Sequence, residues 1–304
     1  MKNKIEFLDL GQQPLANYYL TKSQIKNKER KYRLIVCFNE KNKLVSIKKT
    51  FSSKMMFNNK YPYRSSMSQT MQKSFKELSL QIKKEIKPKK ILEIGSNDGS
   101  FLKNFNKEIS IGVEPCANVE KITKKQKFNT IPKYWNLELA KYILKKHGNV
   151  DLIYSANTIS HIKNLNDVFK SINLVLSKDG VLILEDPSLL ECLKKNTYDQ
   201  FYNEHIYVFS YLSLKNILKK YNLEIYKIDA LSIHGGSNRY FIKRIKNKIK
   251  IDKSVKNQQN REIKYGLDKK NTYFKFKKRV EISKKKLISI FNYCKSKNKK
   301  IIGY

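Results

Sequence analysis

A tyrosine, a glutamate and a histidine fall within four positions in the stretch QFYNEHIYVFSYLSL, residues 200–214. Histidine has an unperturbed pKa of about 6.5, so His205 is suited to removing a proton near neutral pH. Glu204 is suited to orienting the imidazole or to hydrogen-bonding a substrate, and Tyr202 to donating to a developing oxyanion. Taken alone, the segment favours the simpler alternative that these side chains pack an aromatic cluster. The spacing NEHIY is not H-E-x-x-H, which excludes a zinc protease.

The glycine loop ILEIGSNDG, residues 91–99, is a second candidate site. Gly95 and Gly99 let the backbone approach a ligand closely at the carboxyl end of a strand, where open sheets bind ligands. The spacing matches neither G-x-G-x-x-G nor a P-loop, so a pyrophosphate clamp is disfavoured. Glu93 and Asp98 suit a cationic or zwitterionic ligand better than a phosphate.

The elements around this loop predict an α/β fold. Glu114 ends the strand that follows the loop, where a carboxylate can accept both hydroxyls of a ribose. Apolar strands alternate with helical stretches, which indicates a parallel sheet covered on both faces. Two further strands joined by a short turn are expected to be antiparallel. A parallel sheet that ends in such a hairpin is characteristic of the class I methyltransferases. The expected parallel strands are 90–96, 109–115, 150–157 and 180–186, and the hairpin strands are 223–231 and 238–244.

Three regions are expected along the chain. Residues 1–67 form a small β-rich segment, and residues 68–250 form the sheet domain, which opens with a helix from Ser68 to Pro88. Residues 251–304 are expected to hold a basic linker that includes SVKNQQNREIKYG, a helix, and a strand at 299–303 that begins an incomplete C-terminal lobe.

Composition bounds the function further. The chain of 304 residues has a net charge of +38, and residues 243–300 hold 22 Lys and Arg against 4 Asp and Glu, so +18 lies there. We favour a solvated helix surface over a phosphate-binding tail, and hence no nucleic-acid partner, because the lysines alternate with apolar residues at helical spacing. The four cysteines form no C-x-x-C pair, which argues against a zinc ribbon and a disulfide framework. Without an apolar leader or a spanning segment, we expect a cytoplasmic protein that does not enter membranes.

The motif LEIGSNDG followed by GVEP resembles the S-adenosylmethionine-binding methyltransferases. The resemblance implies that the glycine loop holds the methionine end of the cofactor and that Glu114 holds its ribose. It also implies that SANTISHI, residues 155–162, borders the adenine and the sulfonium. The cofactor-binding residues implied in this way are Glu93, Gly95, Ser96, Asn97, Asp98, Gly99, Glu114, Asn157 and His161.

Three more motifs, together with YNEH, resemble the sugar C-methyltransferases, which methylate the carbon beside the ketone of nucleotide-linked keto-deoxysugars. They are LDLGQQPLANYYL (8–20), YPYRSSMS (61–68) and IHGGSNRYF (233–241). A carbon acceptor must lose a proton, which requires a base. The resemblance implies that His205 is this base, with Glu204 and Tyr202 beside it. It further implies that Tyr63 touches the substrate and that His234, Gly235 and Ser237 frame its pocket.

The chain also departs from that family. Asn203 stands where histidine is usual, and Glu40 stands where a cysteine is expected after Cys37, so we expect no zinc. Family members usually begin with a cysteine pair and continue past the final GY, so we expect a chain truncated at both ends. A non-catalytic fragment and a methyltransferase of another acceptor, such as RNA, remain as alternatives. The oligomeric state is not predicted.

Overall fold

The computed structural model of the chain describes residues 4–27 and 29–302. Its centre is a seven-stranded sheet in the order β10-β11-β8-β7-β4-β5-β6, in which β11 runs antiparallel to both its neighbours, β10 and β8, and the strands from β8 to β6 pair in parallel. This confirms the α/β fold with a terminal antiparallel hairpin. The strands are β4 (Ile91–Ile94), β5 (Ser110–Val113), β6 (Asn129–Ile131), β7 (Val150–Ala156), β8 (Leu176–Pro187), β10 (Leu223–Leu231) and β11 (Ser237–Arg244).

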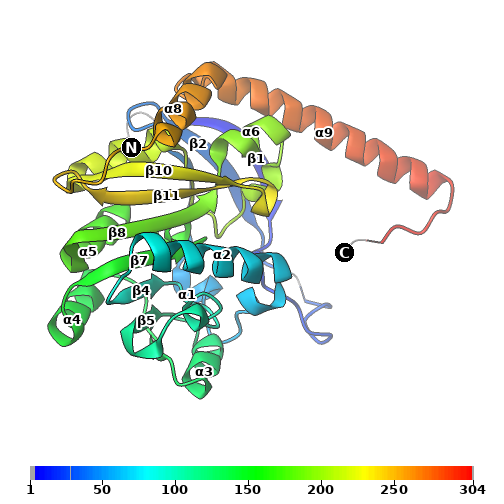
Figure 1. Cartoon of the computed structure of the whole chain (residues 1–304). Coiled ribbons are helices and arrows are strands. Elements are labelled where there is room, and N and C mark those ends of the chain that lie inside the picture. The colour runs from blue at the N-terminus through cyan, green and yellow to red at the C-terminus, as the bar shows by residue number, and fades with distance from the viewer. Residues whose placement is uncertain (1–3, 28, 303–304) are drawn as a thin grey trace.

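Helices cover both faces of this sheet (Figure 1). Ile91 and Leu92, adjacent in β4, belong to different apolar clusters because successive side chains of a strand point to opposite faces. The cluster around Ile91 includes α2, and the cluster around Leu92 includes α4 and α5. The helices are α1 (Ser53–Met56), α2 (Gln69–Glu85), α3 (Ala117–Lys125), α4 (Leu137–His147), α5 (Leu165–Val175), α6 (Leu189–Lys195), α7 (Tyr211–Leu218), α8 (Lys253–Tyr265) and α9 (Lys270–Ser296).

Helix α2 forms where its apolar spacing predicts. Met71, Phe75, Leu78 and Ile82 recur every three to four positions and are all buried. The Ser68 hydroxyl accepts a hydrogen bond from the Met71 N–H at 3.3 Å, which satisfies one of the free donors of the first turn. The helix is thereby held across one face of the sheet.

The N-terminal region forms a second sheet of four strands, in the order β1-β2-β3-β9. Strand β9 lies only two residues beyond His205 in the sequence, and it pairs antiparallel with β3 through Val45 and Val208. The N-terminal sheet therefore takes its last strand from the segment that carries the candidate catalytic residues. Its strands are β1 (Lys4–Gln13), β2 (Tyr32–Asn39), β3 (Val45–Ile47) and β9 (Tyr207–Val208).

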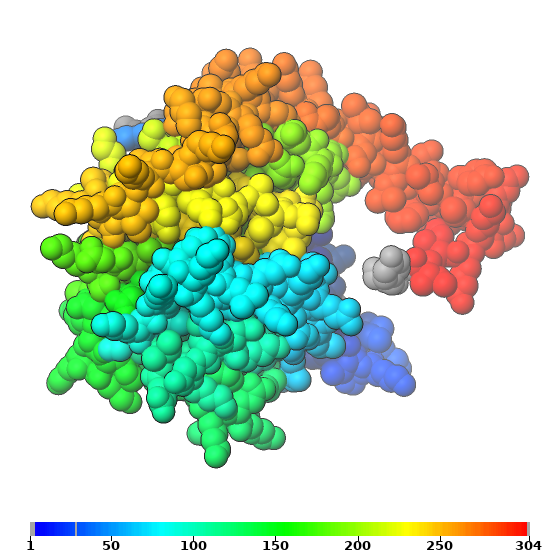
Figure 2. Space-filling model, viewed as in Figure 1, coloured from blue at the N-terminus to red at the C-terminus, as the bar shows by residue number. Residues whose placement is uncertain are grey.

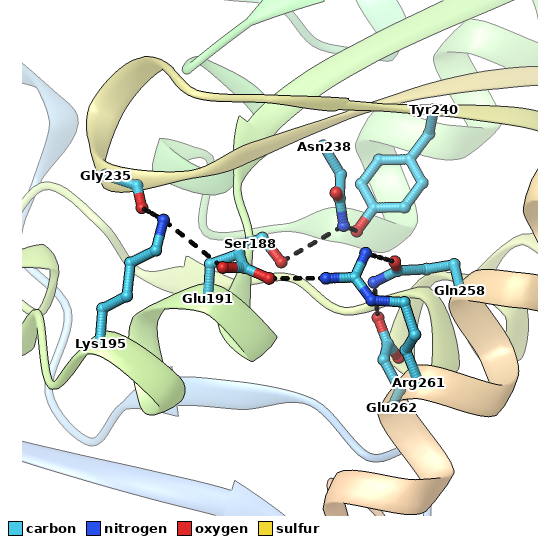
Figure 3. A network of polar contacts seen from close by, with 9 residues as sticks. All are labelled: Ser188, Glu191, Lys195, Gly235, Asn238, Tyr240, Gln258, Arg261 and Glu262. Atoms are coloured by element: carbon cyan, nitrogen blue, oxygen red, sulfur yellow. Dashed lines mark hydrogen bonds and ion pairs between the residues drawn. The ribbon is translucent and has the colours of Figure 1, made fainter.

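The predicted linker after residue 250 is wrong, because residues 253–265 form the helix α8. Its buried positions Val255, Gln258 and Glu262 have helical spacing, but two of the three are polar, so no apolar period marks the helix in the sequence. The Glu262 carboxylate accepts the N–H groups of Tyr211 at 2.8 Å and Leu212 at 3.0 Å, at the start of α7. Figure 3 shows Gln258 and Glu262 in the polar network between α8 and its neighbours.

The predicted strand at 299–303 is also wrong over its described part. Residues 299–302 form no strand, and Gly303 and Tyr304 lie outside the described residues. The far half of α9 stands clear of the rest of the chain in both views (Figures 1 and 2). A strand at 299–302 would have no neighbour there with which to form hydrogen bonds. Across residues 4–27 and 29–302, no helix is both long enough and apolar enough to span a membrane.

Candidate functional site

One cavity of about 590 Å³ brings together residues from the glycine loop, the N-terminal region and the segment around His205. A cavity of this size accommodates a small-molecule ligand. It lies where the parallel strands end, which is where open α/β sheets bind ligands. The predicted site residues that line it are Tyr63, Glu93, Gly95, Asn97, Glu114, Asn157, His161, Tyr202, Glu204, His205 and His234.

The glycine loop approaches Thr158, in the segment after β7, so closely that Gly95 admits no side chain. Its φ is +75°, and a Cβ there would lie 2.1 Å from the Thr158 hydroxyl oxygen. Glu93, before the loop, lines the cavity, and its Oε2 is buried without a hydrogen-bond partner among the described residues. Burial and then the charges of Asp98 and Glu114 raise the pKa of Glu93 well above its usual value. An unpartnered buried carboxyl fits a cationic ligand group such as an ammonium.

Glu114 follows β5 and is held by backbone donors. Its Oε2 accepts the Asn97 N–H at 3.0 Å, and its Oε1 accepts the Cys116 N–H at 2.8 Å. Burial raises the pKa of Glu114, while these hydrogen bonds lower it. Each carboxylate oxygen has a second lone pair, so the group can still accept ribose hydroxyls. The residues present therefore fit S-adenosylmethionine at this end of the cavity.

Two residues of the glycine loop hold the N-terminal region in place. The Asn97 side chain accepts the Ser65 N–H at 2.9 Å and donates to the Tyr63 carbonyl at 3.2 Å. The Asp98 carboxylate accepts the Ser66 N–H at 3.0 Å. The glycine loop and the segment that carries Tyr63 are therefore joined by hydrogen bonds. Of the residues predicted to bind cofactor, Ser96, Asp98 and Gly99 do not line the cavity.

His205 has both ring nitrogens engaged. Its Nδ1 lies 2.9 Å from the Gln200 carbonyl oxygen, which can only accept, so Nδ1 carries the proton. In the neutral ring, Nε2 then accepts from the Tyr202 hydroxyl at 3.0 Å. Burial lowers the pKa of His205 to about 4, so the imidazole is neutral at pH 7. The arrangement presents a neutral imidazole with its accepting nitrogen next to a phenol.

Within the described part of the chain, Glu204 forms no hydrogen bond with either ring nitrogen of His205. It therefore does not orient the imidazole, which was one of the two roles predicted for it. Its Oε1 instead accepts from the Asn17 side-chain amide at 3.0 Å. Burial raises the pKa of Glu204 to about 7, against the lowering effect of that hydrogen bond. Two adjacent residues, Glu204 and His205, thus have pKa values displaced in opposite directions, as in sites that use an acid and a base together.

The other two predicted histidines of the site also lie at the cavity. The His161 ring stacks on Phe57 with centroids 5.3 Å apart, and its centroid lies 5.1 Å from that of His205. Burial lowers the pKa of His161 well below its usual value. His234 Nε2 lies 3.5 Å from the Asn157 side-chain nitrogen. Asn157 and His161 therefore line the same cavity as Gly95 and His205.

Gly235 and Ser237 do not line the cavity, so the predicted substrate frame is reduced to His234. The Gly235 carbonyl accepts from Lys195 Nζ at 2.6 Å, and the Ser237 hydroxyl donates to the Ile233 carbonyl at 3.2 Å. Figure 3 shows Lys195 between this turn and Glu191. The turn is thereby attached to α6.

Several cavity residues were not predicted from the sequence. Asn17, Phe57 and Tyr134 line the cavity although each is far from His205 in the sequence. The Tyr134 hydroxyl donates to the Phe57 carbonyl at 2.5 Å. The motif containing Asn17 was recognised, but nothing local to it indicates a contact with residue 204.

The described residues do not fit a zinc ion. Within 4–27 and 29–302, no three His, Cys, Asp or Glu side chains are grouped as metal ligands. Cys37 is buried in β2 opposite Ser46 of β3. Structural zinc requires four ligands, which Cys37 and its neighbours do not supply.

Three family models match this chain. A model described as "Methyltransferase domain" matches residues 63–228, which is more than half of the chain. A model described as "C-methyltransferase C-terminal domain" matches residues 232–304, and one for a domain proposed to bind zinc matches residues 1–57. These matches reach from residue 1 to residue 304, and they give no support to the expected truncation at both ends.

The C-methyltransferase NovU of Streptomyces niveus is 30% identical over 149 residues, which cover 48% of this chain and 36% of NovU. This chain therefore aligns with about a third of the length of that relative. Two solved structures are similar at low identity. An S-adenosylmethionine-dependent methyltransferase from Clostridium acetobutylicum is 15% identical with a TM-score of 0.44, over 57% of this chain and 91% of that one.

The second structure is the plantazolicin methyltransferase BpumL in complex with SAH, 13% identical with a TM-score of 0.44, over 56% of this chain and 82% of that one. The matched methyltransferase-domain model spans the glycine loop, Glu114 and the Tyr202–His205 segment. The chain belongs to the S-adenosylmethionine-dependent methyltransferases, and its residues 232–304 match the C-methyltransferase C-terminal domain.

Proposed function

We propose that this chain is a C-methyltransferase that deprotonates and methylates the carbon beside the ketone of a nucleotide-linked deoxysugar. One observation carries the proposal. A single cavity joins the glycine loop and Glu114 to a buried, neutral His205. O- and N-methyl transfer need mainly positioning, whereas a C–H acceptor needs a base within the same enclosed space.

His205 is proposed as the general base. Its backbone partner Gln200 keeps the proton on Nδ1, so Nε2 is the nitrogen free of a proton. In the reaction, Nε2 takes the proton from the carbon beside the ketone, and the electron pair of that C–H bond is delocalised onto the ketone oxygen. S-adenosylmethionine, when bound, supplies an electrophilic methyl group for this carbon. Tyr202, within hydrogen-bond distance of Nε2, must turn its hydroxyl away from the ring and can then donate to the ketone oxygen.

Other residues that line the cavity support a nucleotide-linked acceptor. Lys54 and Lys163 are exposed and line the cavity, where their ammonium groups can meet phosphate oxygens. Aromatic side chains, including Tyr61 and Tyr63, line the same space and offer surfaces for a sugar or a base. Glu204, with a pKa near 7, can hydrogen-bond a sugar hydroxyl in either protonation state.

A deuterium-exchange experiment tests the proton-removal step by itself. The protein is incubated in D2O with a thymidine diphosphate-linked keto-deoxysugar, and NMR follows exchange of the hydrogen beside the ketone. We expect exchange with the wild type and none above background with His205→Ala. His147→Ala is the control, because His147 ends α4 and does not line the cavity.

Labelled S-adenosylmethionine then tests methyl transfer. We expect the label on the carbon beside the ketone, located by NMR of the product. Label on an oxygen would contradict the carbon acceptor. Absence of exchange and of transfer, with the cofactor still bound in calorimetry, would favour the non-catalytic alternative.

A further inference from the structure

Asn17, in the connection between β1 and β2, reaches the catalytic segment from the other end of the sequence. Its side-chain Nδ2 donates to Glu204 Oε1 at 3.0 Å, and both residues line the cavity. Glu204 is only 1% exposed and Asn17 is half-buried, so this hydrogen bond is partly shielded from water. Hydrogen bonds to charged groups contribute more than neutral ones, and more so where water is excluded.

A second amide contact fixes the position of Asn17. The side-chain Nδ2 of Asn203 donates to the Pro14 carbonyl at 2.9 Å. Asn203 thus donates a hydrogen bond to the segment 14–17, and Glu204 accepts one from it. Asn17 has a left-handed φ of +59°, which asparagine and aspartate tolerate better than other residues with a side chain. The backbone of Asn17 is therefore held so that its amide meets Glu204.

Three titratable groups are near enough to interact with the charge of Glu204. They are Tyr61, Cys116 and Tyr202, and that charge contributes to raising the pKa of each. None of the three donates to Glu204 Oε1 within the described part of the chain, where the donor is Asn17. Burial raises the pKa of Glu204 and the Asn17 amide lowers it, so the two effects oppose each other at one carboxyl group.

We propose that Asn17 is a positioning residue of the active centre, which holds the Glu204 carboxylate in place beside His205. The N-terminal region then supplies part of the reaction site as well as packing against the methyltransferase domain. The expected effect of Asn17 on turnover rests on the proposed function. The expected effect of Asn17 on the titration of Glu204 does not depend on which reaction is catalysed.

Asn17→Asp provides a sharp test. Aspartate has the shape of asparagine and also tolerates a left-handed φ, but when ionised it cannot donate, and it places a second negative charge near Glu204. The full-length protein is labelled at the glutamate carboxyl carbons with ¹³C and titrated by NMR, with Glu204→Gln used to assign the signal. We expect the Glu204 titration to move to higher pH. We expect turnover to fall by about tenfold or more.

Asn27→Asp is the matched control, because it makes the same change in the same connection at a residue that does not line the cavity. It should leave the Glu204 titration and turnover as in the wild type. Asn17→Ala, which adds no charge, should also raise the titration midpoint. If neither Asn17 variant moves the Glu204 signal, the proposed role of Asn17 is wrong. If the Asn17 variants shift the Glu204 titration but the wild-type protein methylates no keto-sugar, only the proposed function is contradicted.

Discussion

Tyr202 and His205 form a hydrogen-bonded pair in which the phenol oxygen lies 3.0 Å from Nε2. The Gln200 carbonyl holds the proton on the other ring nitrogen, so the tyrosine must be the donor. The proposed base and the proposed oxyanion donor are therefore in contact within the cavity. A keto substrate that enters between them would accept the Tyr202 hydrogen bond at its ketone oxygen and leave Nε2 free to face the neighbouring C–H group.

His205→Ala should leave cofactor binding nearly unchanged and abolish turnover, because the imidazole is the proposed base and its ring nitrogens bond Tyr202 and Gln200, not the glycine loop or Glu114. Calorimetry with S-adenosylmethionine and a product assay measure the two effects separately. His147→Ala should behave like the wild type in both. Turnover near the wild-type level in His205→Ala would exclude the base role.

Tyr202→Phe should raise the pKa of His205 above its value of about 4, because the tyrosine hydroxyl hydrogen-bonds the neutral form of the ring. NMR titration of the imidazole carbons measures the shift. Turnover should fall by about tenfold or more, since the oxyanion loses a donor. A lower pKa in the variant would contradict the assigned direction of the hydrogen bond.

Glu114→Gln should weaken binding of S-adenosylmethionine by about 1.5–3 kcal/mol, because a charged acceptor of the ribose hydroxyls is lost. Isothermal calorimetry measures this loss. Glu108→Gln is the control, since Glu108 is exposed and precedes β5. Unchanged affinity in Glu114→Gln, in a variant with wild-type thermal stability, would refute the ribose assignment.

Asp186→Asn should change how thermal stability depends on pH. Burial raises the pKa of Asp186 to about 8, so the folded state keeps a proton that the unfolded state releases near pH 3.8. The stability that the protonated Asp186 contributes to the folded state is fully present below pH 3.8, and it is lost as the pH rises through about 8.

The melting temperature of Asp186→Asn, measured relative to that of the wild type, should therefore increase from pH 5 to pH 8. Ser160 can still donate to the asparagine oxygen, as it does to Asp186. Asp179→Asn, at an exposed position, should follow the wild-type curve. Parallel curves for Asp186→Asn and the wild type would show that Asp186 is ionised in the folded protein.

Arg239→Met should destabilise the fold by about 3–5 kcal/mol, because it leaves a buried carboxylate without its partner. Arg239 and Glu185 are 6% and 0% exposed at the side chain and lie 2.8 Å apart, and Arg239 also donates to Ser74 of α2. Chemical denaturation measures the loss. Arg33→Met breaks an exposed pair with Asp9 and should change stability little. Equal effects of the two variants would contradict the role of burial.

The sequence alone determined the central sheet, the glycine loop and Glu114 at the end of β5. These features depend on local patterns: apolar runs of strand length, a glycine where φ is positive, and an acid at the next strand end. It did not determine α8, because the buried face of that helix is largely polar. The short β6 was also missed, since it has three residues and no buried side chain.

The tertiary structure decided which predicted residues share a cavity. It placed Asp98, Gly235 and Ser237 in structural hydrogen bonds, and it brought Asn17 to Glu204. Contacts of this kind join residues far apart in the chain and depend on how the two sheets pack. The local spacing of residues in the sequence therefore does not predict them. Residue types and motifs predicted methyl transfer. The burial and the hydrogen-bond partners that set the protonation states of residues such as His205 and Glu204 arise only in the folded chain.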